Sequence, residues 1–513
     1  MSDHSSSPIL PKLSKAYWID SVKSTLFEPL QEDIQSDVVV VGGGITGITA
    51  AYLLSKEGVQ VTLLEADKLL CGTTGHTTAK ITAQHSLFYD ELIQHFGQIK
   101  AKQYYESNRE ALRFIQTTAE ALHIDCQFHA EEAYIYATTK QYAKQIEKEY
   151  DAYQRLSIPG MLVDAIPFSV DVQNAIVMKD QGQFHPLRFL TSLIDHMIKN
   201  GVRIYEGTTA IKVDDDDPLQ PSVITREGHR VRAKKVLSCT HFPFFDLPGL
   251  YASRMYAERS YVIAGNMNGT YPGGMYISAE KTPSRSLRSV DIDGESMVLL
   301  GGDGHRAGQG IDMMEHYKAL RAFGEDVLGM TEIRYRWSAQ DLFTLDKVPY
   351  IGEATHAHPD ILVATGYKKW GMTSGVVAAL LLRDLVVGRE NPYRELYSPS
   401  RFYADPSLKR FFSTNLQVVA HLIQGKFELP LREVDDLGLD EGDIVSYEGK
   451  RVGAYKDLDG HVIVVDTTCT HLGCEVAWNN GDKTWDCPCH GSRFSLEGAV
   501  VEGPAERPLK RLS

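Results

Sequence analysis

The chain has 513 residues and a net charge of −14 at pH 7, with 43% hydrophobic and 23% charged residues. A single hydrophobic core stops growing well below this length, so we expect two or three folded domains. The negative charge excludes a general binder of nucleic acid backbones, because such proteins neutralise phosphates with clustered Lys and Arg.

The N-terminal residues carry no basic start followed by an apolar core, so the sequence predicts no export signal. The most apolar helical stretch, Val376 to Val387, is too short to span a bilayer and contains Arg383 and Asp384. We therefore expect a cytoplasmic protein without a transmembrane anchor.

The first predicted elements form a strand, a glycine turn, a helix and a second strand. Asp37 to Val41 is a β-branched run that leads through glycines into a helical pattern at Ile45 to Ser55, and the apolar run Val59 to Leu64 follows at once. This order is typical of the opening unit of a dinucleotide-binding fold. Helical periodicity then dominates from Tyr89 to about Leu156.

The glycine turn has the spacing G-x-G-x-x-G. Gly42 permits the tight turn, Gly44 lets a pyrophosphate approach the backbone, and Gly47 allows the helix to pack closely on the strand. The helix presents its positive N-terminus to the phosphates, and Glu65 is placed to accept hydrogen bonds from a ribose diol. The predicted nucleotide contacts are Gly42, Gly44, Ile45, Thr46, Gly47 and Glu65.

This glycine motif occurs once and lies close to the N-terminus. The chain therefore lacks a second nucleotide-binding unit of the kind that NAD(P)H would occupy. A single motif at this place favours FAD over NAD as the resident nucleotide.

Short β-like runs replace the helical pattern from Val163 to Met297, with turn signals between them. We expect a second, mainly β substrate domain inserted into the first. The run Ile361–Ala364 and the apolar helix from about Thr373 to Val387 predict a return to the first domain.

A polar stretch with prolines, Tyr397–Pro406, predicts a linker, and an amphipathic helix at about Ser407 to Ile423 leads to a final domain. The predicted parts are an N-terminal extension (1–34), an FAD-binding domain (35–160 and 335–395), a substrate domain (161–334), a linker with the amphipathic helix (396–426) and a last domain (427–513).

Residues 35 to 390 resemble the D-amino-acid oxidase and glycine oxidase superfamily of FAD-dependent oxidoreductases. Besides the glycine motif, the likeness rests on the segments LLCGTTGHTTAKIT, KVLSCTHFP, WSAQDLFTLDKVPYIG and ATGYKKWGMTSG. It implies an α/β FAD-binding Rossmann-like fold with an inserted, mainly β substrate domain. It also places the first segment near the pyrophosphate or flavin and the last near the isoalloxazine. The implied residues are Thr73, Thr74, Thr77, Thr78, Gly366, Gly371, Met372 and Thr373.

The late glycines also suit a flavin site by themselves, because backbone must pass close to a flat ring there. A helix that begins at Thr373 can stabilise negative charge on the flavin. For the threonine-rich segment an ordinary turn stays an alternative.

The same resemblance implies oxidation of a carbon–nitrogen bond by hydride transfer to flavin, with an arginine often holding a substrate carboxylate. No arginine of this chain stands out by motif. Arg285, Arg288 and Arg306 lie in the predicted substrate domain, and each also fits a solvated or structural role. The sequence therefore leaves the catalytic residues unassigned.

Near the C-terminus, Cys469-x-His471 is followed after fifteen residues by Cys487-x-x-His490. A Rieske [2Fe–2S] centre needs two thiolates on one iron and two neutral imidazoles on the other, supplied by two loops. These four residues are the predicted cluster ligands. A structural zinc site, which uses the same residue types, is the alternative.

The last domain resembles Rieske proteins. The resemblance implies a disulfide between Cys474 and Cys489, one from each loop, and a proline loop at Gly503-Pro504-Ala505. Ser492 matches a serine whose hydroxyl donates to a cluster sulfur, whereas Phe494 stands where respiratory Rieske proteins carry a tyrosine. With one donor fewer, we expect a potential below the top of the Rieske range of about −150 to +300 mV.

The whole chain resembles the FAD-dependent Rieske [2Fe–2S] proteins of bacilli. A flavin accepts two electrons as a hydride and a Rieske cluster carries one, so the combination predicts an electron splitter. The main hypothesis is an enzyme that oxidises a small amine or amino acid and passes single electrons to an external acceptor. The alternatives are an electron-transfer protein reduced by a partner protein, and a purely structural Rieske domain.

Overall fold

The computed structural model describes residues 9–401, except 24, 216–219, 293 and 311, together with residues 407 and 432–513. The predicted linker and amphipathic helix at 396–426 lie mostly outside these residues, as does the predicted start of the last domain. In the parts described, no helix is long and apolar enough to cross a membrane.

One six-stranded sheet of the described residues contains the predicted nucleotide-binding unit, and only its outermost pair is antiparallel. Its order is β18 (Tyr350–Thr355), β19 (His358–Thr365), β12 (Lys235–Ser238), β2 (Val38–Val41), β3 (Val61–Leu64) and β8 (Arg203–Tyr205). The predicted strand, glycine turn, helix and strand all form, and α2 (Ile45–Lys56) is the helix.

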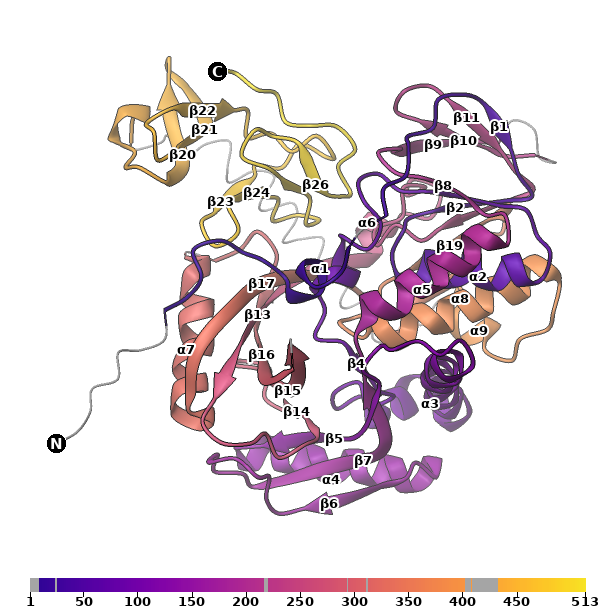
Figure 1. The fold of residues 1–513 in the computed structure, drawn as a ribbon, viewed down its shortest axis with the longest axis vertical. Helices are drawn as coiled ribbons and strands as arrows, with labels where there is room; N and C mark the ends of the chain where they lie inside the picture. Colours follow the sequence, from indigo (N-terminus) through magenta and orange to yellow (C-terminus); the bar gives the residue numbers. More distant parts are fainter. Residues whose placement is uncertain are drawn as a thin grey trace.

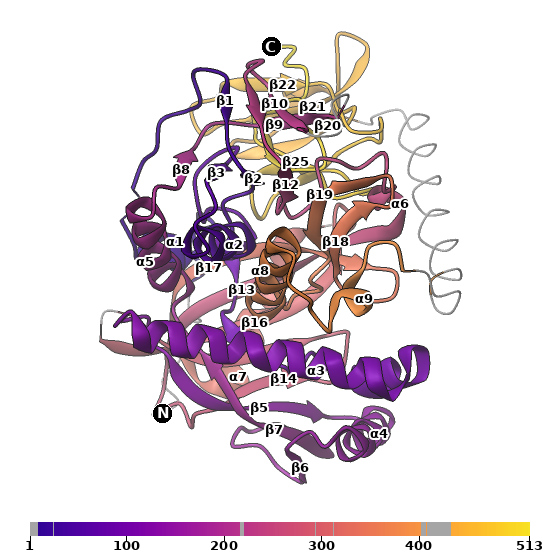
Figure 2. The same cartoon turned by 90° about the vertical axis from the view of Figure 1, so that its right-hand side faces the viewer.

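Both faces of this sheet are covered, which explains the continuous apolar run of β2. Side chains alternate across a strand, so Val38 and Val40 pack beneath α2, α5 (Pro186–Lys199) and α8 (Gly371–Val387). Val39 and Val41 face a smaller sheet on the other side. That sheet consists of β1 (Ile34–Gln35), β11 (Arg230–Arg232), β10 (Ser222–Thr225) and β9 (Ala210–Asp214). Figure 2 shows the three helices side by side.

A second large sheet, nine-stranded in the described residues, forms the lower half of the view in Figure 1. Its path is β17 (Met330–Thr344), β13 (Met255–Met267), β16 (Glu295–Arg306), β15 (Arg285–Ile292), β14 (Met275–Ser278), β5 (His129–Ala137), β7 (Asn174–Gln183) and β4 (Lys80–Ile81), with β6 (Gly160–Val163) beside β7. Alternation along β13 sends Tyr261 and Ile263 toward α7 (Met313–Leu328) and Val262 and Ala264 toward the nucleotide-binding half.

The structure differs from the predicted helical stretch between Tyr89 and Leu156. Helices α3 (Tyr89–Ala121) and α4 (Lys140–Leu156) form, but β5 separates them. Its sequence HAEEAYIYA alternates in the way a half-buried strand does, and it pairs with β7 and β14. The two domains also interleave more than the predicted boundaries imply. Strands β8 and β12 come from the predicted substrate domain, yet they lie in the six-stranded sheet.

The last domain has two small antiparallel sheets within the described residues 432–513. Trp485 is fully buried, and its ring lies so close to Gly453 that a Cβ there would be 2.9 Å away. The first sheet contains β20 (Glu441–Tyr447), β21 (Lys450–Lys456) and β22 (Val462–Val465), and the second β23 (Ala477–Asn479), β24 (Thr484–Asp486), β25 (Arg493–Phe494) and β26 (Val500–Glu502).

The nucleotide-binding half contains a buried ion pair whose loss should be costly. Arg401 and Asp346 each expose 3% of their side chains, and Nε and Nη2 of the arginine lie 2.8 Å from the two carboxylate oxygens. We expect Asp346→Asn to lower the free energy of unfolding by about 3–5 kcal/mol, because it leaves a buried guanidinium uncompensated. Denaturant unfolding followed by circular dichroism measures this change.

Glu353→Gln is the matched control, because its pair with Arg394 is more exposed. It should change the free energy by no more than about 1 kcal/mol. Equal effects of the two substitutions would contradict a special role for the buried pair.

Candidate functional site

The glycine turn between β2 and α2 leaves no room for side chains. Gly42 has φ +108°, and a Cβ there would lie 2.5 Å from the carbonyl oxygen of Cys239 at the end of β12. A Cβ on Gly47 would lie 1.9 Å from the carbonyl oxygen of Gly42. Helix α2 begins after Gly44, which has no side chain of its own to cap the helix. Its N-terminus therefore stays available for an anion such as a phosphate.

Glu65 lies at the end of β3 and holds the same turn. One carboxylate oxygen accepts from the N–H of Gly43 at 2.7 Å and the other from the N–H of Asp67 at 3.0 Å. Burial raises the pKa of Glu65 above its ordinary value. A carboxylate in this position can still accept hydrogen bonds from a diol through its remaining lone pairs.

The threonine-rich segment is fixed by side chains from three distant parts of the chain. The indoles of Trp337 and Trp18 donate to the carbonyl oxygens of His76 and Thr77, at 2.9 and 2.7 Å. The guanidinium of Arg288 donates to Thr78 and Ala79 at 3.0 and 2.7 Å. The four successive carbonyl groups of residues 76–79 therefore each accept a hydrogen bond from a side chain of the β domain or of the N-terminal segment.

Thr74 ties the threonine-rich segment to the glycine turn. The hydroxyl of Thr74, in the short helix η1 (Thr73–His76), accepts from the N–H of Ile45 at 3.0 Å. The hydroxyl of Thr77 accepts from the N–H of Ala79 at 2.9 Å. The structure thus brings this segment against the start of α2, and its shape is set by these bonds.

The late segment reaches the same place. The hydroxyl oxygen of Tyr367 lies 2.9 Å from the hydroxyl oxygen of Thr46. A Cβ on Gly375 of α8 would also lie 2.9 Å from the hydroxyl oxygen of Thr46. Helix α8 begins at Gly371, two residues before the predicted start. The hydroxyl of Thr373 donates to the carbonyl of Thr82 at 3.1 Å, which anchors the helix start. The three predicted flavin-binding segments therefore converge.

A charged group lies beside this late segment, on β13 and β17. Glu258 and Asp341 oppose each other across these strands, and Nζ of Lys369 is 3.5 Å from the Glu258 carboxylate. Burial raises the pKa of Asp341 to about 6. Two positions along, the rings of Tyr256 and Phe343 stack at 5.2 Å. Cations of the protein lie over both rings: the guanidinium of Arg306 is 3.6 Å from the centre of the Tyr256 ring, and Nζ of Lys369 is 5.8 Å from the centre of the Phe343 ring.

The four predicted cluster ligands lie together in two pairs. Contact with Cys487 lowers the pKa of Cys469 to about 7, and the rings of His471 and His490 are 5.0 Å apart. Burial lowers the pKa of both histidines to about 4, so that at neutral pH each ring is in the uncharged form that binds iron. The residues present therefore fit a cluster held by two thiolates and two imidazoles.

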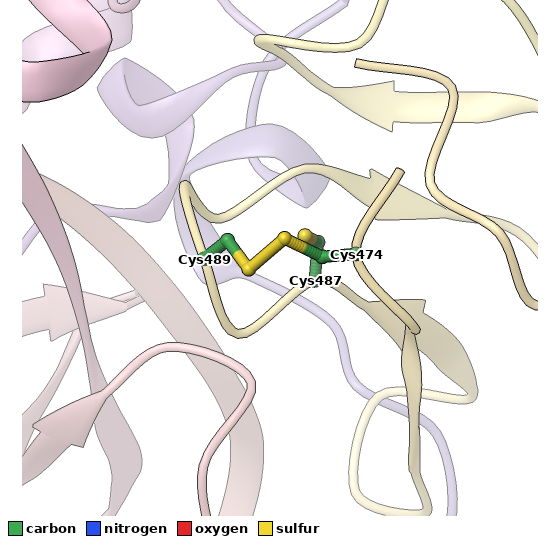
Figure 3. Close-up of side chains that lie close together, drawn as sticks. All are labelled: Cys474, Cys487 and Cys489. Carbon is green, nitrogen blue, oxygen red and sulfur yellow. A yellow bond between two sulfur atoms is a disulfide. The ribbon is translucent and has the colours of Figure 1, made fainter. Parts of the chain in front are cut away.

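The other two cysteines of the loops form the disulfide that the resemblance implies. Figure 3 shows Cys474 bonded to Cys489, with Cys487 beside them. The hydroxyl oxygen of Ser492 accepts from the N–H of Ala505 at 3.0 Å, which leaves its proton free to donate to a cluster sulfur. Phe494 is fully buried and offers no such donor.

The cluster loops lie against the flavin-binding half. The ring of Phe242, which follows β12, is 6.1 Å from that of His471. Gln340 of β17 donates to the carbonyl of Gly491 at 2.7 Å. Figure 1 shows this domain beside β17 and above α7. Since Cys239 at the end of β12 contacts Gly42, one short segment links the glycine turn to a predicted iron ligand.

Comparison with known proteins gives two family matches. Residues 37–385 match the FAD dependent oxidoreductase family and residues 428–513 match the Rieske [2Fe-2S] domain. The chain belongs to the FAD dependent oxidoreductase family and carries a Rieske domain. It therefore binds FAD and a [2Fe–2S] cluster. This confirms both cofactor predictions and favours the cluster over the zinc alternative.

Three similar proteins illustrate this relationship. A Rieske 2Fe-2S iron-sulfur protein of Bacillus subtilis, YhfW, is 47% identical over 97% of each chain. Gamma-glutamylputrescine oxidoreductase of Escherichia coli is 24% identical over 73% of this chain and 89% of its own. Glycine oxidase from Geobacillus kaustophilus superposes with a TM-score of 0.60 at 18% identity, over 72% of this chain and 99% of its own. This last likeness confirms the predicted fold.

Two buried polar atoms add to the fit between the protein and FAD. Nε2 of His241 and Oγ of Ser374 have no hydrogen-bond partner among the described residues. His241 follows the strand whose end contacts Gly42, and Ser374 lies in the first turn of α8. Buried polar atoms are normally paired, so a bound cofactor is a natural partner for them.

Sequence reasoning missed the side chains that shape the flavin site from outside. Trp18 carries no local motif, Trp337 begins a segment quoted for the family resemblance without a role of its own, and Arg288 was one of three arginines without an assigned role. Their partners are backbone carbonyl groups far away in the chain. A single sequence contains no signal that connects such pairs.

The indole of Trp18 provides a test of the flavin-binding segment. Trp18→Phe keeps the ring but leaves the carbonyl of Thr77 without its donor. We expect the dissociation constant for FAD to rise about tenfold, equivalent to about 1.4 kcal/mol. Titration of the apoprotein with FAD, followed by flavin fluorescence, measures it. Trp478→Phe in the Rieske domain is the matched control and should leave the constant unchanged.

The predicted ligand set is tested by Cys487→Ser, which removes one thiolate. The protein should lose its iron and the Rieske signal in electron paramagnetic resonance (EPR), yet keep its FAD absorption. Metal analysis and EPR of the dithionite-reduced protein measure this. Cys126→Ser, at a free cysteine outside both the cluster loops and the predicted flavin-binding segments, should keep both cofactors. Full iron content in the Cys487 variant would disprove its assignment as a ligand.

Proposed function

We propose that this oxidoreductase removes a hydride from the carbon next to a substrate amino group and passes the electrons singly through its Rieske cluster to an external acceptor. The observation that carries the proposal is the contact between the two cofactor-binding parts, where Phe242 packs on His471. Two redox groups placed in one chain at adjoining sites favour transfer between them over a purely structural Rieske domain.

Bound FAD supplies an acceptor for the hydride, and the bound cluster carries one electron at a time. The substrate loses a hydride from carbon and a proton from nitrogen, and two single-electron transfers to the acceptor balance each turnover. Water then hydrolyses the resulting imine to a carbonyl compound and an amine or ammonia.

Glu258 and Asp341 support an amine as the substrate. These carboxylates lie beside Lys369. In the sequence, Lys369 stands between Gly366 and Gly371, the late glycines that we propose approach the flavin ring. Asp341 is ionised above pH 6, so it attracts an ammonium group and accepts a proton from the nitrogen. By their names, the gamma-glutamylputrescine oxidoreductase and the glycine oxidase act on an amine and an amino acid.

The proposal is tested by anaerobic addition of amines, polyamines, methylated amines and amino acids to the protein. One class should bleach the flavin absorption and then produce the EPR signal of the reduced cluster. Bleaching only by a reductase protein would favour the alternative of an electron-transfer protein. Bleaching by substrate without the cluster signal would refute the relay.

The role of Asp341 gives a pH dependence with a definite sign. The apparent KM for an amine should rise as the pH falls through about 6, because the carboxylate gains a proton and loses its charge. Asp341→Asn should raise the KM at pH 8 at least tenfold and abolish this pH dependence. Stopped-flow flavin reduction measures both. Glu332→Gln, at an exposed carboxylate on the same strand, is the control and should behave as the unmodified protein.

A further inference from the structure

A buried group of charges joins the flavin-binding half to the Rieske domain. Arg259 of β13 is 0% exposed and lies 3.7 Å from Asp482, 3.5 Å from Asp486 and 3.7 Å from Glu502. Arg493, within the Rieske domain, pairs with the same three carboxylates at 3.0, 3.2 and 3.3 Å. Two arginines therefore share three carboxylates, and Arg259 is the member that the flavin-binding half contributes.

The neighbouring strand holds Arg259 in this position. Its guanidinium donates to the hydroxyl of Ser338 at 2.9 Å and to the amide oxygen of Gln340 at 3.1 Å, both on β17. Ser338 in turn donates to Asp482. The amide nitrogen of Gln340 donates to the carbonyl of Gly491, the residue after a predicted iron ligand. One continuous set of hydrogen bonds thus runs from β13 to the cluster loop.

Backbone contacts around these charges are too close for an intervening layer of water. A Cβ on Gly308, which has φ +66°, would lie 2.5 Å from Cα of Pro488. A Cβ on Gly491 would lie 2.7 Å from Cβ of Ala257. Both contacts involve the loop between Cys487 and Gly491. The flavin-binding half and this loop therefore fit each other in one arrangement.

Charge pairing makes that arrangement specific. Asp482 and Asp486 expose 7% and 3% of their side chains, and each carboxylate lies within 4 Å of both Arg493 and Arg259. A buried charge without its partner is strongly unfavourable, so a shifted or rotated Rieske domain would lose both the pairing and the fit. In some proteins, buried ionic groups select a single arrangement of the parts that they join.

We propose that Arg259 is a positioning residue that keeps the cluster-bearing loop docked on the flavin-binding half, so that electrons pass between the cofactors without movement of the Rieske domain. The inference rests on the proposed relay and adds how its two sites are held together. It predicts transfer within one chain, at a rate independent of protein concentration.

The holoprotein is tested without a substrate, by reducing its flavin with a light pulse in the presence of EDTA. Cluster absorbance then reports the arrival of the electron. In the unmodified protein the rate should not depend on protein concentration. Arg259→Met should slow it at least tenfold, because the docked loop loses its charged anchor. Amide hydrogen exchange of residues 481–493 should rise at least tenfold in the same variant.

Two further variants separate positioning from a general loss of structure. Gln340→Met leaves the charges paired but removes the bond to Gly491, and should slow transfer about threefold with FAD and iron retained. Arg334→Met, at an ion-paired arginine on the outer part of β17, should change nothing. Unchanged transfer and exchange in both the Arg259 and Gln340 variants would overturn the proposal. Because light replaces substrate, failure of every amine to bleach the flavin would refute the proposed reaction alone.

Discussion

The carbonyl oxygen of Gly42 lies so close to helix α2 that any side chain at Gly47 would collide with it. The rest of the nucleotide site depends on this packing. It sets where α2 begins, and Thr74 and Tyr367 then bring the threonine-rich segment and the late segment to that helix. The end of β12 is fixed by the same turn, because the carbonyl of Cys239 lies against Gly42.

Polar contacts, rather than a shared apolar core, attach the Rieske domain to this site. Arg259 pairs with carboxylates of the Rieske domain, Gln340 donates to the carbonyl of Gly491 in the cluster loop, and Arg336 donates to the carbonyl of Gly481 at 2.8 Å. Arg336 also donates to the carbonyls of Pro11 and Lys12, both at 2.6 Å. The N-terminal segment, β17 and the Rieske domain are therefore joined at one side chain, while Trp18 of the same N-terminal segment holds the threonine-rich segment.

Short sequence patterns were sufficient to predict those features that depend on residues close together in the chain. The glycine spacing identified the turn and α2, and the two cysteine–histidine pairs predicted loops that the structure brings together, because both patterns depend on residues a few positions apart. The strand β5 was missed because helical periodicity on both sides outweighed its short alternation. The sequence analysis also missed that segments of the predicted substrate domain lie in the six-stranded sheet. A single sequence does not indicate which distant segments pair as strands.

The sequence by itself determined the cofactors and the order of the domains, because both follow from short motifs whose geometry is nearly independent of the rest of the chain. Only the tertiary structure decided how the two redox sites meet. The contact of Phe242 with His471 and the placement of Arg259 among three Rieske carboxylates join residues more than 200 positions apart. Such pairs are selected by packing and by the cost of burying unpaired charge, which depend on the complete fold.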